Sequence, residues 1–161
     1  MTQPEDFTNG MRRLAAGVSL ITTQRDGVRY GLIATAVTSV CAAPPTLLIC
    51  VNRTASIHEH LIQSGSFCVN VLSANQSSIA TRFATPKDRE TRFDVGNWTA
   101  RQTGAPALQG ACVSFDCRTS HHIAQGTHTV LFGLIENVWL QDEAAPLTYH
   151  GGRFGTLTQI T

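Results

Sequence analysis

The sequence predicts a mainly β domain, an antiparallel barrel of about seven strands with short helices at its periphery. Three observations lead to this fold class. Apolar segments rich in β-branched residues are bounded by turn-forming residues, most of them follow one another directly, and the helical periodicities are brief. The 161 residues suffice for one domain, taken as residues 1–161. Because 42% are hydrophobic and only 14% charged, a largely disordered chain is excluded.

The first elements are a short helix and a hairpin. Apolar residues recurring on one helical face predict an amphipathic helix over 5–16: Phe7, Met11, Leu14 and Ala15. The β-branched stretch after this helix, and the turn-forming Asp26-Gly27 pair, predict a hairpin of strands 17–23 and 29–39.

The middle of the chain alternates strands with short helices. Residues 46–52 are apolar on both faces, which predicts a central strand that begins after the Pro44-Pro45 pair. Ser56 and Glu59 have the spacing of a capping box that opens a helix to about Ser64. A strand over 67–72 follows, and a second capping box at 73–76 leads into a helix that ends near Phe83.

The last third contains one aperiodic segment and the remaining strands. Residues 84–110 lack periodicity and include Trp98, so we expect a functional or interfacial loop there. Two long strands near 111–121 and 127–140 are separated by Gln125-Gly126, and a short strand lies near 146–149.

Charge and motif content exclude several classes of protein. The net charge is +1, too small to attract nucleic acid or an anionic membrane, and no apolar run could span a bilayer. The N-terminus lacks the apolar stretch of a secretory signal, and five cysteines without a CxxC pair indicate reduced thiols in the cytoplasm. Dinucleotide, phosphate-loop and metal motifs are absent, so we expect no metal site.

Two segments could approach a ligand closely. Residues 31–40 are rich in small and hydroxyl side chains, which would let a flat ligand lie against the backbone, although threonine is also a good strand former. Residues 50–56 join a buried strand to a helix N-terminus, a suitable place for a phosphate, although Ser56 could equally be an ordinary cap there.

Two later segments carry histidine and arginine beside glycines. His128 opens a strand after a glycine turn and could orient a substrate or donate a proton, but a lone strand histidine is often structural. In the segment 149–154, the Gly-Gly pair permits close backbone approach and Arg153 could hold a phosphate. A terminal turn with a surface arginine is the alternative.

Taken together, these segments resemble a known family, the short-chain flavin reductases, which are the reductase components of two-component flavin-dependent monooxygenases. The resemblance runs from about residue 7 to 157 and rests on six segments in the same order: MRRLAAGV with ITT (11–18, 21–23), ATAVTSV (34–40), PPTLLICVNR (44–53), FCVNVL (67–72), GTH (126–128) and YHGGRF (149–154). Each segment alone is weakly specific, whereas the ordered series is strongly specific.

The resemblance implies an FMN-binding split β-barrel with Greek-key topology, a homodimer, and hydride transfer from NADH or NADPH to FMN or FAD. Reduced flavin would pass to a separate monooxygenase chain. Alternatives are a non-catalytic flavin-binding protein, because fold does not determine function, and a reductase of a corrin or ferric acceptor through bound flavin.

The resemblance also implies the site residues. The isoalloxazine ring would lie beside Ala34, Thr35, Ala36, Ser39, Val40, Cys50, Val51 and Asn52. The ribityl phosphate would lie at Arg53 and Ser56, with a further contact from Arg82 and Phe83. His128 would lie near the nicotinamide as the catalytic-site histidine, and the closing segment over the flavin would contribute Tyr149, Gly152, Arg153 and Phe154.

Overall fold

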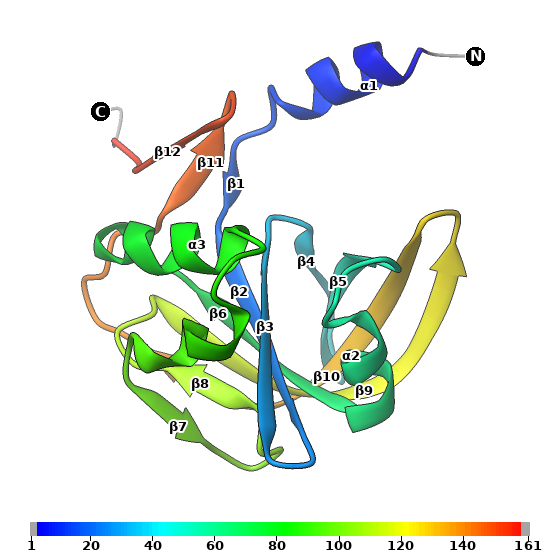
Figure 1. Ribbon diagram of the computed structural model, residues 1–161, viewed down its shortest axis with the longest axis vertical. Helices are drawn as coiled ribbons and strands as arrows, with labels where there is room; N and C mark the ends of the chain where they lie inside the picture. The colour runs from blue at the N-terminus through cyan, green and yellow to red at the C-terminus, as the bar shows by residue number, and fades with distance from the viewer. Residues whose placement is uncertain (1–2, 159–161) are drawn as a thin grey trace.

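A seven-stranded antiparallel sheet forms the body of the computed structural model, which describes residues 3–158 (Figure 1). Its strands lie in the order β3-β2-β6-β9-β10-β5-β4. Their bounds are β2 (Ser19–Arg25), β3 (Val28–Ala34), β4 (Val37–Ala42), β5 (Pro45–Asn52), β6 (Ser66–Val71), β9 (Val113–Gln125) and β10 (His128–Leu140). The predicted mainly β, antiparallel fold class is therefore confirmed.

The two edges of this sheet are joined by a very short piece of chain. β3 and β4 lie at opposite edges, yet only Thr35 and Ala36 separate them in sequence. Three residues of extended chain span at most about 11 Å. The sheet must therefore curl until its edges meet at this link, which makes a barrel that is joined at one end and split along β3 and β4. The predicted continuous strand over 29–39 is wrong, because the chain changes edges inside it.

The connection from β5 to β6 gives the barrel its Greek-key topology. β6, β9 and β10 are consecutive antiparallel neighbours, and β5 lies on the far side of β10. The chain must therefore cross the β9–β10 hairpin to pass from β5 to β6, as a Greek key requires. β5 has strand neighbours on both sides, as predicted for an interior strand, and it buries Leu47, Ile49 and Val51 on one face while the other face is half-buried.

The two helices of the body pack against different faces of the sheet. α2 (His58–Ser64) and α3 (Ser77–Ala84) are separated by β6 and by the short 3₁₀ helix η1 (Ala74–Gln76). The predicted capping box at Ser73 and Gln76 is confirmed, although it caps η1 rather than α3 directly. The predicted box at Ser56 is wrong: α2 begins after Ile57 without a side-chain cap, and Glu59 instead accepts a hydrogen bond from Gln63.

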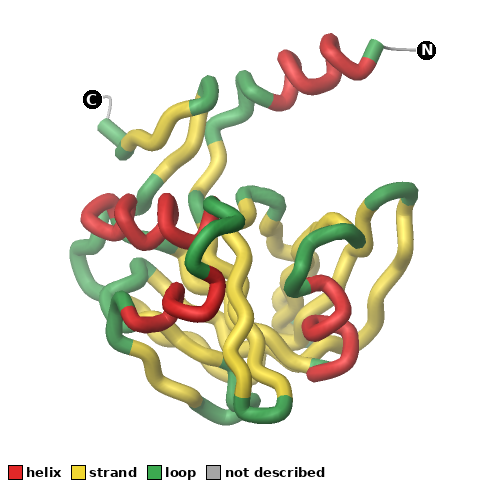
Figure 2. The backbone as a smooth tube through the Cα atoms, in the orientation of Figure 1, coloured by secondary structure: helices red, strands yellow, loops and turns green. Residues whose placement is uncertain are grey.

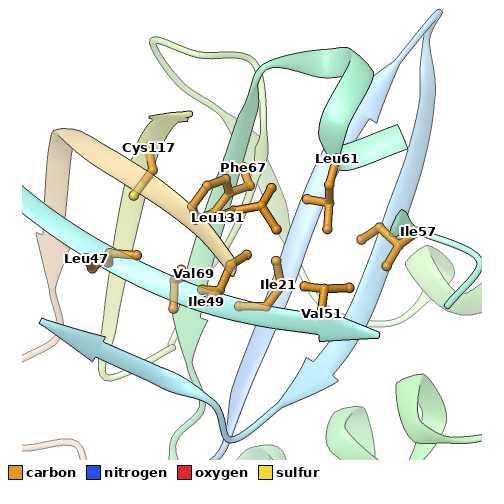
Figure 3. Close-up of a cluster of buried hydrophobic side chains, with 10 residues drawn as sticks. All are labelled: Ile21, Leu47, Ile49, Val51, Ile57, Leu61, Phe67, Val69, Cys117 and Leu131. Carbon is orange, nitrogen blue, oxygen red and sulfur yellow. The ribbon is translucent and has the colours of Figure 1, made fainter. Parts of the chain in front are cut away.

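The main core fills the barrel interior beneath α2 (Figure 3). Ile57 and Leu61 point from α2 toward Ile21, Val51 and Leu131, and all five side chains are at most 2% exposed. Burying side chains of this size stabilises the fold by about 1.5–3 kcal/mol each. The helix therefore closes the split side of the barrel with its apolar face and leaves its polar face outside.

A second core cluster packs aromatic rings against β3 and orders most of the segment predicted to be aperiodic. Phe83, Phe93 and Trp98 contact one another with ring centroids 4.8–5.9 Å apart. Residues 84–110 contain the 3₁₀ helix η2 (Arg89–Asp94) and the paired strands β7 (Trp98–Ala100) and β8 (Pro106–Leu108). The expected lack of regular structure there is wrong, because aromatic burial and this short ladder order the segment.

One buried side chain ties β8 to the barrel. Asn70 is fully buried on β6, and its Oδ1 accepts hydrogen bonds from the Leu108 amide and the Ser114 hydroxyl, both at 2.8 Å. Its Nδ2 donates to the Leu20 carbonyl at 3.1 Å. Because buried polar groups are costly without partners, this amide specifies where β8 docks on the sheet.

The two ends of the described chain form a small sheet apart from the barrel. β1 (Ala16–Gly17), β11 (Thr148–His150) and β12 (Arg153–Gly155) pair in the order β1-β11-β12, so the predicted strand near 146–149 is found as β11. α1 (Pro4–Met11) extends from this sheet away from the body and buries none of its residues (Figure 2). It ends several residues before the predicted limit of 16. Within residues 3–158, no helix is long and apolar enough to cross a membrane.

Candidate functional site

The strand pair β4–β5 brings the two predicted ring-binding segments together. The Cys50 amide donates to the Ala36 carbonyl at 3.1 Å, which continues the ladder beyond Val37 and Ile49 to the link between β3 and β4. At that link the Val37 amide donates to the Thr35 carbonyl at 3.1 Å, which makes a tight turn. Ala34 is half-buried beside it, and Val51 faces the core.

Small exposed side chains cover the outer surface of this edge: Thr35, Ala36 and Ser39, with Val40 beyond them. β4 pairs only with β5, so its other edge carries backbone amides and carbonyls without strand partners. A flat ligand with hydrogen-bonding groups along its rim could therefore lie here against backbone and short side chains. The half-buried Cys50 lies behind them.

The end of β5 meets the start of β10. Asn52 lies opposite His128 in the ladder, and the Arg53 amide donates to the Thr127 carbonyl at 2.9 Å. Asn52 Oδ1 accepts hydrogen bonds from the amide and hydroxyl of Thr54, both at 2.9 Å, and so holds the turn after β5. The structure thus brings Cys50, Asn52, Arg53 and His128 to one end of the barrel. A hollow of about 590 Å³ opens there between Arg53, His58 and Thr127.

His58 is the titratable group whose surroundings are most informative here. Its Nε2 is 2.8 Å from the Thr129 hydroxyl. Partial burial, followed by the nearby positive charge of Arg53 and the neighbouring His122, lowers the pKa of His58 below 6.5. The surroundings therefore disfavour positive charge on His58, and the neighbouring Arg53 could form a charge-assisted hydrogen bond to a phosphate.

Two of the predicted contact residues lie elsewhere. Arg82 is directed to the loop after α3, where its guanidinium donates to the Thr91 carbonyl and hydroxyl at 2.8 and 2.9 Å. Phe83 is only 2% exposed and packs in the second core cluster against β3, where Gly31 leaves it room: an added Cβ at Gly31 would clash with the Phe83 ring. Within one chain, Phe83 therefore packs in the core, away from the β4–β5 edge.

The predicted closing segment forms the β11–β12 hairpin. Gly151 and Gly152 have φ values of 59° and 84°, as a type I′ turn requires, so this pair makes the turn between the strands. Tyr149 and Phe154 face each other with ring centroids 5.8 Å apart, and Arg153 is exposed. The hairpin lies on the opposite side of the molecule from the tip of β9 and β10 (Figure 1). A single chain therefore does not bring these residues to His128.

A second hollow, of about 550 Å³, adjoins the site and contains residues that the sequence did not indicate. It is lined by Ser56 and also by Arg29, Tyr30, His60 and Arg92. These residues come from β3, α2 and η2, so no local spacing relates them. The one available signal was the concentration of arginines around the aromatic Phe93 in an otherwise aperiodic stretch.

Across residues 3–158, no group of three or more histidine, cysteine, aspartate or glutamate side chains is placed to hold a metal ion. All five cysteines are free thiols, and burial raises the pKa of Cys117 to about 12. The groups available at the β4–β5–β10 end are instead backbone amides, hydroxyls, an arginine and histidines.

The chain is similar in sequence and in structure to known flavin reductases. The model of the flavin reductase like domain matches residues 11–158. A protein of Stutzerimonas stutzeri named FMN reductase (NADH) RutF is 42% identical over 154 residues, which cover 96% of this chain and 88% of that protein.

Solved structures agree with this match. BorF, the flavin reductase component of a bacterial two-component tryptophan halogenase, is 31% identical with a TM-score of 0.90, covering 98% of this chain and 100% of that one. The NADH:FAD oxidoreductase SgcE6 of Streptomyces globisporus, solved with NAD and FAD fragments, is 28% identical with a TM-score of 0.90, covering 98% and 96%. The protein therefore belongs to the flavin reductase like domain family.

Proposed function

We propose that this protein is an NADH-dependent flavin reductase that transfers a hydride from NADH to FMN or FAD and supplies reduced flavin to a separate monooxygenase chain. The observation that carries the proposal is the exposed edge of small residues at β4, set against the converging ends of β5 and β10. Membership of the flavin reductase like domain family, and relatives named FMN reductase (NADH), support the same activity.

The residues of β4 fit an isoalloxazine ring. Thr35, Ala36 and Ser39 present side chains short enough for a flat tricyclic ring to reach the backbone, while hydroxyls and free edge amides offer donors to its polar rim. Bound there, the flavin supplies the ring system that accepts the hydride from NADH. Donors along β4 would stabilise negative charge in the reduced ring, so no acid–base pair is required of the chain.

The phosphate end of the flavin would lie at Arg53 and Ser56. Arg53 follows β5 directly, and after burial its positive charge is the next cause of the lowered pKa of His58, because it repels a proton there. An anion would relieve that repulsion. Arg53 would also supply a charge-assisted hydrogen bond to a phosphate oxygen.

His128 would position the nicotinamide. It is exposed at the start of β10 opposite Asn52, and its Nδ1 is 2.9 Å from the Thr127 hydroxyl. We expect His128→Ala to raise the KM for NADH about tenfold, with a smaller effect on flavin binding, because one positioning hydrogen bond is lost. His121→Ala is the matched control on the same hairpin, where the ring stacks on Phe132. Complete loss of flavin affinity in His128→Ala would contradict this role.

A homodimer would complete the site. The support is the apolar surface left uncovered at the ends of the chain: Phe7 is 65% exposed, Leu14 58% and Leu157 65%. In addition, β4 is open on one side, and a barrel this small does not enclose a ligand lying along its outer edge. Dilution to the monomer should then weaken flavin affinity. A monomer that binds FMN as tightly as the dimer would remove the proposal.

Anaerobic titration tests the reductase activity directly. NADH is added to the protein with FMN or with FAD, and loss of the oxidised flavin absorbance is followed against a control without protein. Rapid bleaching supports the reductase. Flavin binding without bleaching would instead indicate a non-catalytic flavin-binding protein.

The cellular setting follows from the same proposal. A partner monooxygenase would receive the reduced flavin, and adding a candidate oxygenase should convert NADH consumption into product formation.

A cytoplasmic location is supported by the five free cysteines, two of which are fully buried. Fractionation of cells with an antibody against the chain would test the location.

A further inference from the structure

The hollow beside Ser56 has the composition of an anion-binding site. Arg29, Arg89 and Arg92 line it from β3 and η2, and Glu90 is the single acidic residue in its lining. Among residues 3–158, the ion pairs are Arg25 with Asp26 and Arg118 with Glu136, so none of these three arginines is paired with a carboxylate. The lining therefore carries more positive than negative charge.

Arg92 is the most informative of the three arginines. Its side chain is only 7% exposed, its guanidinium donates to the Thr85 carbonyl, and its Nε has no hydrogen-bond partner. Burial, and then repulsion from Arg89, lowers the pKa of Arg92, with Asp88 opposing the shift. Holding a charged guanidinium in a buried position with an unused donor is costly. A bound anion would offset this buried charge.

Flat side chains lie beside these charges. Tyr30 and His60 stack with ring centroids 3.7 Å apart and planes inclined by 12°, and the buried His60 Nδ1 has no hydrogen-bond partner. Arg29 lies over the Phe93 ring at 4.7 Å. The hollow thus combines phosphate ligands with an aromatic stack and an unused ring nitrogen, and its volume of about 550 Å³ lies in the usual range for small-molecule sites.

The hollow is also continuous with the proposed flavin site. A shallow depression lined by Arg53, Ser56, His58 and His60 shares Ser56 and His60 with this hollow, and shares Arg53 and His58 with the hollow at the end of β5. A ligand anchored at Arg53 could therefore extend past Ser56 toward Arg92 without leaving the protein surface.

We propose that this hollow, called here the Arg92 pocket, binds the adenosine-phosphate half of a dinucleotide, with Arg92 and Arg29 as phosphate ligands and the Tyr30–His60 stack beside the base. The inference rests on the proposed function for the rest of the ligand. It deepens that function, because a pocket for this half would let the reductase distinguish dinucleotides from mononucleotides. FAD and NADH both carry this half, and the experiment separates them.

Direct binding of AMP is the first test. We expect AMP to bind the full chain and to perturb the NMR signals of His60 and Tyr30. Arg29→Gln and Arg92→Lys should each weaken AMP binding about tenfold or more, because a charge-assisted hydrogen bond to phosphate is lost or reduced. Arg101→Gln is the matched control, since Arg101 lies over Trp139 and lines a different hollow. Arg29 is exposed, so its variant keeps the test valid if Arg92→Lys does not fold.

Selectivity ratios identify the source of the bound half. The ratio of kcat/KM for FAD to that for FMN, and the ratio for NADH to reduced nicotinamide mononucleotide, are measured for the wild type and the variants. A fall in the first ratio assigns the pocket to FAD, and a fall in the second assigns it to NADH; either result supports the proposal. Absence of AMP binding with both ratios unchanged in Arg29→Gln would overturn it. Failure of the proposed reductase function would be seen separately, because the wild-type protein would then reduce no flavin.

Discussion

The barrel and the terminal sheet treat their apolar side chains in opposite ways. In the barrel, Ile21, Ile49 and Leu131 are completely buried, and α2 covers the split side. In the terminal region, Phe7 on α1 and Leu14 after it remain more than half exposed. A single chain therefore accounts for the stability of the barrel, while the terminal region is organised for contact with something else, which we propose is a second copy.

In the barrel, the largest loss of stability should come from replacing the buried side chain of Asn70. Asn70→Leu removes the acceptor of the Leu108 amide and Ser114 hydroxyl and the donor to the Leu20 carbonyl. Leaving these groups unsatisfied should lower the free energy of unfolding by at least about 3 kcal/mol. Urea unfolding measures the change, and Asn97→Leu at an exposed position is the control. Equal stability of the two variants would contradict the anchoring role of Asn70.

A smaller effect is expected where two strands approach a core ring. An added Cβ at Gly133 would lie 2.5 Å from the Phe67 ring and 2.9 Å from the Cys117 Cβ. Gly133→Ala should therefore lower the free energy of unfolding by about 1–3 kcal/mol through overpacking. Gly17→Ala, where nothing lies within 4 Å, should change it by less than about 0.5 kcal/mol. Thermal unfolding of both variants would show whether the barrel interior is as tightly packed as its burial indicates.

Substitutions in the terminal region should weaken the association of two copies and leave the stability of the barrel nearly unchanged. Replacing Phe7 and Leu14 together by serine should change the free energy of unfolding of the monomer by less than about 0.5 kcal/mol, because neither residue contacts the core. Dimer dissociation should rise about tenfold or more if these side chains are buried between copies. Light scattering during size-exclusion chromatography measures this. A wild-type protein that is monomeric at all concentrations would contradict the proposal that the terminal region contacts a second copy.

The smallest expected effect is on the pH dependence of stability, through His58 at the start of α2 on the barrel. Because the folded pKa of His58 lies below 6.5, the unfolded state binds a proton more readily, so stability present above about pH 6.5 is lost as the pH falls. His58→Gln can keep a hydrogen bond to Thr129 but removes the titration, so this acid-linked loss should become smaller. Urea unfolding over a pH series, with His121→Gln as control, measures the change. An unchanged pH dependence would show that Arg53 and His122 do not act on His58 as described.

Much of the barrel could be predicted because local chemistry and tertiary structure agree there. The Asp26-Gly27 turn, the β-branched strands and the Ser73–Gln76 box each specify local geometry that the fold keeps. The break at residues 35–36 could not be predicted in this way. Thr35 and Ala36 are compatible with a strand, and the break arises only because two distant sheet edges must meet there.

The residues of the candidate site also divide into those that could be predicted from the sequence and those that could not. Residues 34–40, 50–53 and 128 were expected together through the family resemblance, and β4, β5 and β10 place them at one end of the barrel. Arg29 and Arg92 were missed because 62 positions separate them in sequence and only packing of η2 over β3 brings them to one hollow. The exposure of Phe7 was also unexpected, because helical periodicity reveals an apolar face and not the surface that covers it.

The joint at Thr35 and Ala36 has a consequence for how this barrel could evolve or be engineered. The same short span closes the cylinder and provides the proposed ring-binding surface, so an inserted residue there would loosen the seam and displace the ligand in one event. A nick at that joint would let the two edge strands β3 and β4 move apart, and an unpaired edge strand can recruit a foreign strand. An inserted loop is therefore better placed at the turn of the β9–β10 hairpin than at the link between β3 and β4.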